Sequence, residues 1–190
     1  YDIGEGWTSA NALPCCALSK VLLNTNLYSA GPANSITFTY TAAGNALNPR
    51  EVVVRLSNTT VAQKPMPYFN YLKDTIRNLP LSVFSGPSFL GVSINGNSSV
   101  VSDRIVVSNF SVTYPATFNF NNEKNFYFEL KDNTLGNYLV ITNFNSNGIA
   151  PVLYDYNNGK RIIGDISTAG QVKFALDPSS DILRRFNLMS

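Results

Sequence analysis

Apolar and polar residues alternate along much of the chain with a period of two, which is the spacing of half-buried β-strands. In residues 33–41, Ile36, Phe38 and Tyr40 alternate with serines and threonines, and a valine-rich segment follows at 51–56. Further segments of this kind recur at short intervals to the end of the chain. We predict strands at residues 81–84, 89–94, 100–114, 117–120, 125–130, 138–144, 152–156, 161–166, 171–176 and 185–189.

Turn residues between these segments predict how the strands connect. Asn95-Gly96 is a strong signal for a tight hairpin turn, because both residue types tolerate positive φ. Residues 121–124 are expected to join 117–120 to 125–130 in one hairpin, and residues 157–160 to form the tip of another. The alternation changes phase between Val107 and Phe110, which predicts a β-bulge there, near residues 108–109.

Only residues 66–78 raise the question of a helix. Phe69, Leu72 and Ile76 have helical spacing, but prolines precede and follow the segment. The pattern leaves a short helix and an extended loop equally open.

The predicted fold class is therefore all-β, with no βαβ rhythm. Pro115 is a plausible boundary, since the connections become shorter after it. We expect an antiparallel β-sandwich, jelly-roll-like, in residues 1–115, with an irregular lead-in over residues 1–32. A smaller, hairpin-rich β unit is expected in residues 116–190.

Composition excludes more functions than it suggests. The 190 residues include no histidine, so a Ser-His-Asp triad, a Cys-His dyad and His-ligated metal centres cannot form within this chain. The net charge is +2, with 14 basic and 12 acidic residues and no basic run, so we expect no nucleic-acid partner. The 24 asparagines and 32 serines and threonines carry much of the polarity. We predict no catalytic residue, no cofactor and no metal site, and ligand-binding residues cannot be assigned.

The two cysteines, Cys15 and Cys16, are neighbours in the sequence. A disulfide between neighbours requires a strained ring, so two free thiols are expected. No run of 18 apolar residues occurs, so we expect no transmembrane segment. Since the chain starts with Tyr1 and has no signal-peptide pattern, we expect it to be an excised piece of a longer protein.

Four weak site candidates remain. Gly4-Glu5-Gly6 lacks the third glycine of a nucleotide-binding loop, and a flexible lead-in is the better interpretation. Residues 155–159 favour a hairpin turn over half a calcium loop, although a surface Ca²⁺ site stays open. Most carboxylates are expected in turns or at strand ends, but a chance catalytic pair is not excluded. The less regular segments hold aromatic residues for which packing is favoured over sugar binding, namely Trp7, Tyr28, Tyr68 and Tyr71.

The last third of the chain resembles a known family. The ordered segments are YLVITNF at 138–144, PVLY at 151–154, RIIGDI at 161–166, QVKFAL at 171–176 and RRFNLMS at 184–190. This succession resembles the region just before the peptidase domain in the PorU-like sortases of the type IX secretion system. These sortases are relatives of the gingipain-type cysteine peptidases of the Bacteroidetes. Gly4-Glu5-Gly6-Trp7 and residues 103–107 are softer cues.

The resemblance implies a parent protein that is exported, to the outer-membrane surface or the extracellular space. Such a protein removes C-terminal sorting domains from secreted cargo and helps attach the cargo to a surface glycolipid. Catalysis in that family uses a Cys and a His in a domain that would begin after Ser190, so neither Cys15 nor Cys16 is carried over as a nucleophile. This chain would then be a noncatalytic accessory region. Its implied partners are the downstream peptidase domain, secretion-system subunits and the C-terminal domains of cargo.

Two other hypotheses stay open. In the first hypothesis, the chain is an independent carbohydrate-binding or adhesion module. This hypothesis is supported only by the aromatic residues and asparagines. In the second hypothesis, the chain is an enzyme whose catalytic residues are carboxylates alone.

Overall fold

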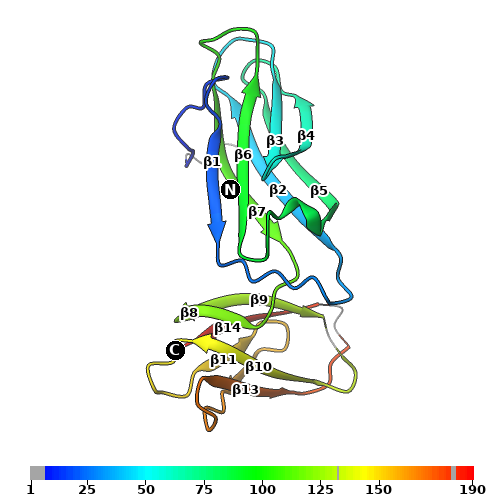
Figure 1. Ribbon diagram of the computed structural model, residues 1–190, viewed down its shortest axis with the longest axis vertical. Coiled ribbons are helices and arrows are strands. Elements are labelled where there is room, and N and C mark those ends of the chain that lie inside the picture. The colour runs from blue at the N-terminus through cyan, green and yellow to red at the C-terminus, as the bar shows by residue number, and fades with distance from the viewer. Residues whose placement is uncertain (1–6, 132, 181–182) are drawn as a thin grey trace. The chain divides into compact units, whose positions relative to one another are not determined.

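The computed structural model describes residues 7–131, 133–180 and 183–190. The chain divides into two compact units, Tyr1–Thr117 and Phe118–Ser190, hereafter unit 1 and unit 2. Among the described residues, the regular structure consists of β-strands and one short 3-10 turn at Leu81–Val83 (Figure 1). The predicted fold class, an antiparallel β-sandwich followed by a smaller β unit, is confirmed.

Unit 1 consists of two antiparallel sheets. Its strands are β1 (Leu18–Leu23), β2 (Ser35–Gly44), β3 (Glu51–Leu56), β4 (Thr59–Pro65), β5 (Tyr71–Pro80), β6 (Phe89–Asn97) and β7 (Ile105–Thr113). One sheet has the order β1-β6-β3-β4 and the other has the order β5-β2-β7. Alternate residues of β2 and β6, such as Phe38, Tyr40 and Ile94, are buried in a core shared by the two sheets. This burial is the physical basis of the period-two pattern in the sequence.

Unit 2 also has two sheets. Its strands are β8 (Asn119–Glu123), β9 (Asn125–Lys131), β10 (Asn137–Phe144), β11 (Val152–Asp155), β12 (Lys160–Ile163), β13 (Gln171–Leu176) and β14 (Leu183–Met189). Their orders are β13-β10-β8 and β12-β11-β14-β9, and the β8–β10 pair is parallel. Phenylalanines are frequent in the core, where Phe120, Phe174 and Phe186 are fully buried. The rings of Phe120 and Phe126 stack with centroids 3.9 Å apart.

Two local predictions are confirmed. The pairing of β2 with β7 shifts by one residue between Asn109 and Val107, so the predicted bulge is present at Ser108. Strands β11 and β12 pair in register, from Val152 with Ile163 to Asp155 with Lys160, which confirms the hairpin around residues 157–160.

Several local predictions are wrong. The lead-in expected to be irregular over residues 1–32 contains strand β1, which pairs with β6. Residues 66–78 form neither a helix nor an extended loop, because most of them belong to strand β5. The strand expected at 81–84 is the 3-10 turn. Asn95-Gly96 is not a turn, since β6 continues through both residues to Asn97 while it pairs with β3. Strands β8 and β9 are consecutive but do not pair with each other, because β8 pairs with β10 and β9 with β14.

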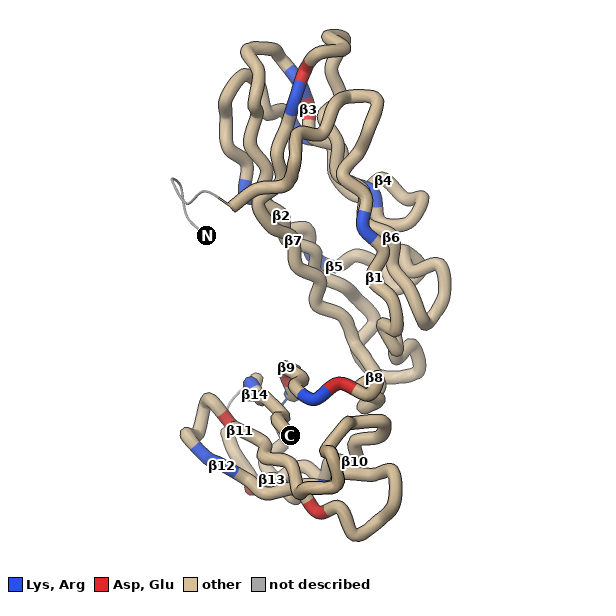
Figure 2. The backbone as a smooth tube through the Cα atoms, turned by 90° about the vertical axis from the view of Figure 1, so that its left-hand side faces the viewer, with Lys and Arg blue, Asp and Glu red and all other residues tan. Residues whose placement is uncertain are grey.

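Charged residues are sparse along both units (Figure 2). Within the described ranges, no helix has the length and the hydropathy needed to cross a bilayer.

Candidate binding site

One end of unit 1 is organised around a buried arginine. Arg50 precedes β3, and Asp103 lies in the β6–β7 loop, 53 positions away in the sequence. The Arg50 Nε and Nη2 atoms donate to the two Asp103 carboxylate oxygens at 2.7 and 2.6 Å, in the bidentate geometry that is strongest for this pair. Their side chains are 0% and 1% exposed. The loop before β3 and the loop before β7 are therefore joined beneath the surface.

The same guanidinium holds two further pieces of backbone. It donates to the carbonyl oxygens of Ala46, Met66 and Tyr68. These carbonyls come from the β2–β3 loop and from the β4–β5 connection. A single side chain thus fixes three loops that are distant in sequence, and each of its donors is used, as burial of a charge requires.

The Asp103 carboxylate stays ionised in this setting. Burial alone would raise the pKa of Asp103, but hydrogen bonds from Arg50 and Asn48 outweigh burial and lower it. The Asn48 amide donates to the carboxylate at 3.1 Å. The pair is therefore a charged structural element rather than a proton donor.

The backbone around this pair is tightly constrained. Gly44 lies so close to the Tyr68 carbonyl and the Arg50 guanidinium that a Cβ at this position would overlap both. Tyr68 has a φ of 58°, a left-handed conformation that is unfavourable for a bulky residue. Its backbone N–H donates to the Asn48 carbonyl at 2.8 Å and its carbonyl accepts from Arg50, so both sides of the residue are fixed. Backbone strain of this kind concentrates at functional sites.

A shallow pocket of about 740 Å³ opens above this framework. Its apolar lining includes Leu13, Leu47, Phe69 and Val101, and its polar lining comes from Asn45, Asn48, Ser102 and Arg104. Phe69 is 63% exposed and Leu47 is 73% exposed, so the apolar groups present surface to solvent. Single exposed apolar residues are common, but a cluster around a pocket is typical of an interaction site.

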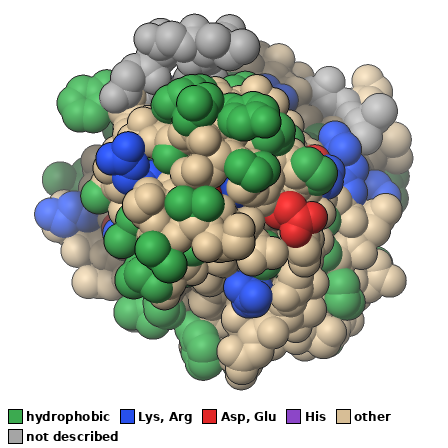
Figure 3. Space-filling view, turned by 90° about the horizontal axis from the view of Figure 1, so that it is seen from above, with side chains coloured by type: hydrophobic (Ala, Val, Ile, Leu, Met, Phe, Trp, Pro, Cys, Tyr) green, Lys and Arg blue, Asp and Glu red, His purple; other side chains and the backbone are tan. Residues whose placement is uncertain are grey.

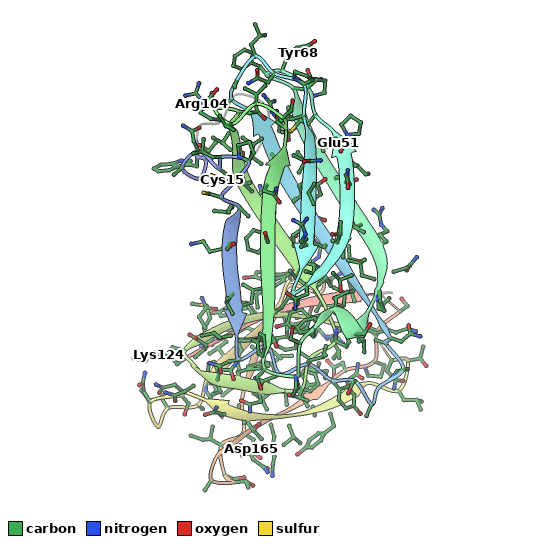
Figure 4. The ribbon with its side chains drawn as sticks, turned by 45° about the horizontal axis from the view of Figure 1, so that its top comes forward. Cys15, Glu51, Tyr68, Arg104, Lys124 and Asp165 are labelled. Atoms are coloured by element: carbon green, nitrogen blue, oxygen red, sulfur yellow. The ribbon has the colours of Figure 1, made fainter. Side chains whose placement is uncertain are left out.

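Figure 3 looks onto this end of unit 1 and shows hydrophobic side chains gathered there, with isolated basic groups among them. In Figure 4, Tyr68 and Arg104 lie at this end, contributed by different loops. We call the surface formed by Leu47, Tyr68, Phe69, Val101 and Arg104 the end-loop surface. It offers aromatic stacking, apolar contact and the exposed cation of Arg104, and among the described residues no carboxylate lines the pocket.

The aromatic residues singled out in the sequence do not behave as expected. Trp7, Tyr28, Tyr68 and Tyr71 are all exposed rather than packed. Tyr68 belongs to the end-loop surface. Tyr28 lies elsewhere, since its backbone donates to the Pro115 carbonyl. The prediction that packing is favoured is therefore wrong for these residues.

The other candidates give no binding centre. The Asp155 carboxylate accepts hydrogen bonds from the backbone N–H groups of Asn157 and Asn158 and pairs with Arg184, so its oxygens serve the hairpin turn. Residues 4–6 lie outside the described residues. Cys15 and Cys16 are free and exposed, as predicted. In the described part of the chain, no group of three or more potential ligands (His, Cys, Asp or Glu) could hold a metal ion.

Sequence reasoning missed the residues that build this site. Its spacing places Phe69 in a helical apolar stripe, and no motif connects Arg50, Asp103 and Arg104. A signal was present in retrospect, because Asn-Pro-Arg at 48–50 places an arginine in a loop, directly before a strand of valines. No local spacing reveals that Asp103 is its partner.

Comparison with known proteins supports the fold and little more. No protein-family model matches the chain, and no curated protein matches it. The crystal structure of dimeric latent PorU from Porphyromonas gingivalis is similar over 90% of this chain, with a TM-score of 0.51 and 9% identity. This chain covers 17% of that PorU chain. The likeness therefore shows a shared fold for a small part of a much longer protein.

Carbohydrate-binding domains are also among the similar structures. The CBM36-1 domain of a multidomain xylanase from the hindgut metagenome of Trinervitermes trinervoides matches 60% of this chain and 90% of its own, with a TM-score of 0.39 and 11% identity. The sugar-binding C-terminal domain of EclA matches 60% of this chain and 82% of its own, with a TM-score of 0.40 and 10% identity. At these scores, the matches do not distinguish between functions.

Proposed function

We propose that this chain is a noncatalytic β-rich region of a PorU-like cell-surface cysteine peptidase, and that it binds cargo or partner subunits or orients the peptidase domain. The observation that carries the proposal is the match of 90% of the chain, through both units, to a single PorU structure. The ordered segments at 138–144, 151–154, 161–166, 171–176 and 184–190 are its sequence counterpart. The parent protein would act on the outside of the cell.

The structure of unit 1 suggests how such a region works. The Arg50–Asp103 pair fixes the loops before any ligand arrives, so binding to the end-loop surface loses little conformational entropy. A rigid sandwich that presents loops at one end is a common arrangement for recognition. We therefore assign docking of partners, including the C-terminal domains of cargo, to the end-loop surface.

Unit 2 offers a second, different surface for the peptidase domain. Tyr127 on β9 and Tyr154 on β11 both pair with Asn187 of the strand between them, so their side chains lie on one face of this sheet. Tyr127 is 54% exposed and Tyr154 is 37% exposed. Aromatic residues on a sheet face are suited to cover by a neighbouring domain.

The first test is to determine the coding sequence beyond residue 190. A downstream domain with a histidine and a cysteine in gingipain-type motifs would support the proposal. An unrelated domain or a stop codon at that point would overturn it.

The second test concerns the end-loop surface. Tyr68→Gly removes an exposed ring and relieves the positive φ, so we expect weaker binding of a cargo C-terminal domain without loss of stability. Tyr138→Ser, which removes another exposed ring from unit 2 (66% exposed, against 51% for Tyr68), is the control. Calorimetric titration of both variants measures the difference, and equal binding by both would remove the end-loop surface from the proposal.

A second candidate function is carbohydrate or adhesion binding by an independent module. Two exposed rings, Tyr68 and Phe69, adjoin a pocket lined by Asn45 and Asn48, which offer apolar faces and amide hydrogen bonds to a sugar ring. Affinity electrophoresis in gels that contain soluble polysaccharides tests this function. Retardation of the native chain that is lost in Phe69→Ala would favour it, and unchanged mobility in all gels would exclude it for those polymers.

A further inference from the structure

The two neighbouring cysteines are placed for chemistry that the proposed function does not use. Their Sγ atoms are in direct contact. Both side chains are exposed (Figure 4 labels Cys15), so a reagent in solution reaches them directly. The chain contains no other cysteine.

The backbone holds this pair in a fixed turn. The Cys16 N–H donates to the Leu13 carbonyl at 2.9 Å, which closes the turn that carries both thiols. On one side the segment is tied to β7, because Ala12 and Ile105 exchange two backbone hydrogen bonds at 2.9 and 3.1 Å. On the other side β1 begins at Leu18. Anchoring at both ends keeps the two sulfur atoms at a high effective concentration relative to each other.

We propose that Cys15 and Cys16 form a reversible dithiol–disulfide site that reacts with small-molecule disulfides such as oxidised glutathione. The Cys15 thiolate attacks one sulfur of the glutathione disulfide and releases the first glutathione. The Cys16 sulfur then attacks the Cys15 sulfur and releases the second. Two protein thiols are oxidised to one disulfide, one glutathione disulfide is reduced, and the two protons end on the two glutathione thiols.

Ring strain makes this bond a labile one. A disulfide between adjacent residues departs from ordinary disulfide geometry, and strained, exposed disulfides are reduced readily. Contact with the Cys15 thiol raises the pKa of Cys16, and desolvation and the Cys15 charge add to this shift. The site is therefore suited to reversible reaction, not to structural cross-linking. It adjoins the binding pocket, since Leu13 of the same turn lines it.

The experiment uses the full chain and its Cys15→Ser and Cys16→Ser variants. Each protein is reduced, treated with oxidised glutathione and quenched with iodoacetamide. Its intact mass is then measured by mass spectrometry. We expect the native chain to be two hydrogens lighter than its reduced form, to take up no alkyl group, and to return to the reduced mass with dithiothreitol. Each single variant should instead retain one glutathione, because its remaining thiol has no neighbour to displace it.

A native chain that keeps glutathione on either cysteine, that remains fully open to alkylation, or that forms disulfide-linked dimers would overturn the proposal. Phenylarsine oxide provides an independent check. It should add once to the native chain, with loss of one water as both thiols bind arsenic, and should not form this adduct with either variant. All proteins stay comparable, since both positions are exposed and the fold of each variant is verified by its circular dichroism spectrum. These results do not depend on whether the end-loop surface binds cargo.

Discussion

Each unit contains a buried Arg–Asp pair, but the two pairs position different parts of the structure. In unit 1, Arg50 and Asp103 join loops that are 53 positions apart, and the guanidinium also binds three carbonyls. In unit 2, Arg184 of β14 meets Asp155 at the end of the adjacent strand β11, at 2.5 Å. Its guanidinium also donates to the Asp177 carbonyl, and its central carbon lies 5.1 Å from the centre of the Phe186 ring.

The difference lies in what each pair positions. Asp155 pairs within its own sheet and accepts hydrogen bonds from the backbone of the neighbouring turn, so it stabilises a hairpin. Burial alone would raise the pKa of Asp155, but hydrogen bonds from Arg184 and Asn158 lower it, as the corresponding bonds do for Asp103. The chemistry is therefore alike, while the unit 1 pair underlies the pocket lined by Phe69 and Arg104. Because Arg50 and Asp103 come from loops that are distant in sequence, their contact also supports the end-loop surface.

The largest expected effect comes from removing one arginine. Arg50→Met leaves the Asp103 carboxylate buried without its partner, which should destabilise unit 1 by about 3–5 kcal/mol. Arg184→Met should have a similar effect on unit 2 while the end-loop surface stays intact. Urea unfolding followed by NMR, in which the amide signals of each unit are resolved, measures both. The double variant Arg50→Met/Asp103→Leu is the control, and it should recover much of the loss because no unpaired charge remains.

The second-largest effect should be a loss of stability of unit 1 at alkaline pH. Burial raises the pKa of Tyr40 in unit 1 to about 12, and the Asp74 carboxylate adds to the shift. Because the folded pKa lies above the unfolded value of 10.0, this stabilisation is complete below pH 10 and is lost as the pH rises toward 12. Between pH 9 and about 12, the melting temperature of unit 1 should fall further in the native chain than in the Tyr40→Phe variant. An identical pH dependence in the two proteins would contradict the assignment.

A single methyl group should disturb unit 1 to an intermediate degree. Gly44→Ala places a Cβ against the Tyr68 carbonyl and the Arg50 guanidinium, and overpacking of this kind costs about 1–3 kcal/mol. Gly91→Ala is the matched control on β6, since its Cβ would meet Ser57 at an ordinary 3.5 Å. The urea midpoints of the two variants give the comparison. Equal midpoints would mean that the end loops adapt more easily than their contacts suggest.

The smallest effect should come from a surface ion pair of unit 1. Lys64 and Asp74 lie 2.8 Å apart, but the lysine side chain is 47% exposed. Lys64→Met should change the free energy of unfolding by about 0.2–1 kcal/mol, as exposed pairs do. A loss close to that of Arg50→Met in the same urea titration would show that burial is not what distinguishes the two pairs.

The sequence predicts elements well where burial follows the local period. Alternation places β2, β10 and β13 closely, and the phase change locates the bulge at Ser108. It fails where long-range pairing overrides a local signal. Asn95 and Gly96 have the composition of a turn, yet they pair with Val53 and Val52 inside a sheet. A hairpin signal cannot reveal that β6 has partners on both sides.

The binding site was beyond prediction for the same reason. Arg50 draws its partners from positions 46, 66, 68 and 103, and these distances in sequence carry no periodic signal. The exposed ring of Phe69 resembles a core residue in any scan for apolar spacing. Tyr68 was noticed as an aromatic residue in an irregular segment, but its strained backbone became visible only in the structure.

The position of the last strand has a consequence for how the chain matures during synthesis. Strand β14 lies between β9 and β11 in the sheet order, although it is made after both of them. Unit 2 therefore cannot close while its final residues are still inside a ribosome or a narrow export channel, whereas all strands of unit 1 are complete by Thr113. Until β14 arrives, β9 and β11 present open edges that another chain can pair with. A chain interrupted before residue 183 should thus keep a folded unit 1 and carry an aggregation-prone remnant of unit 2.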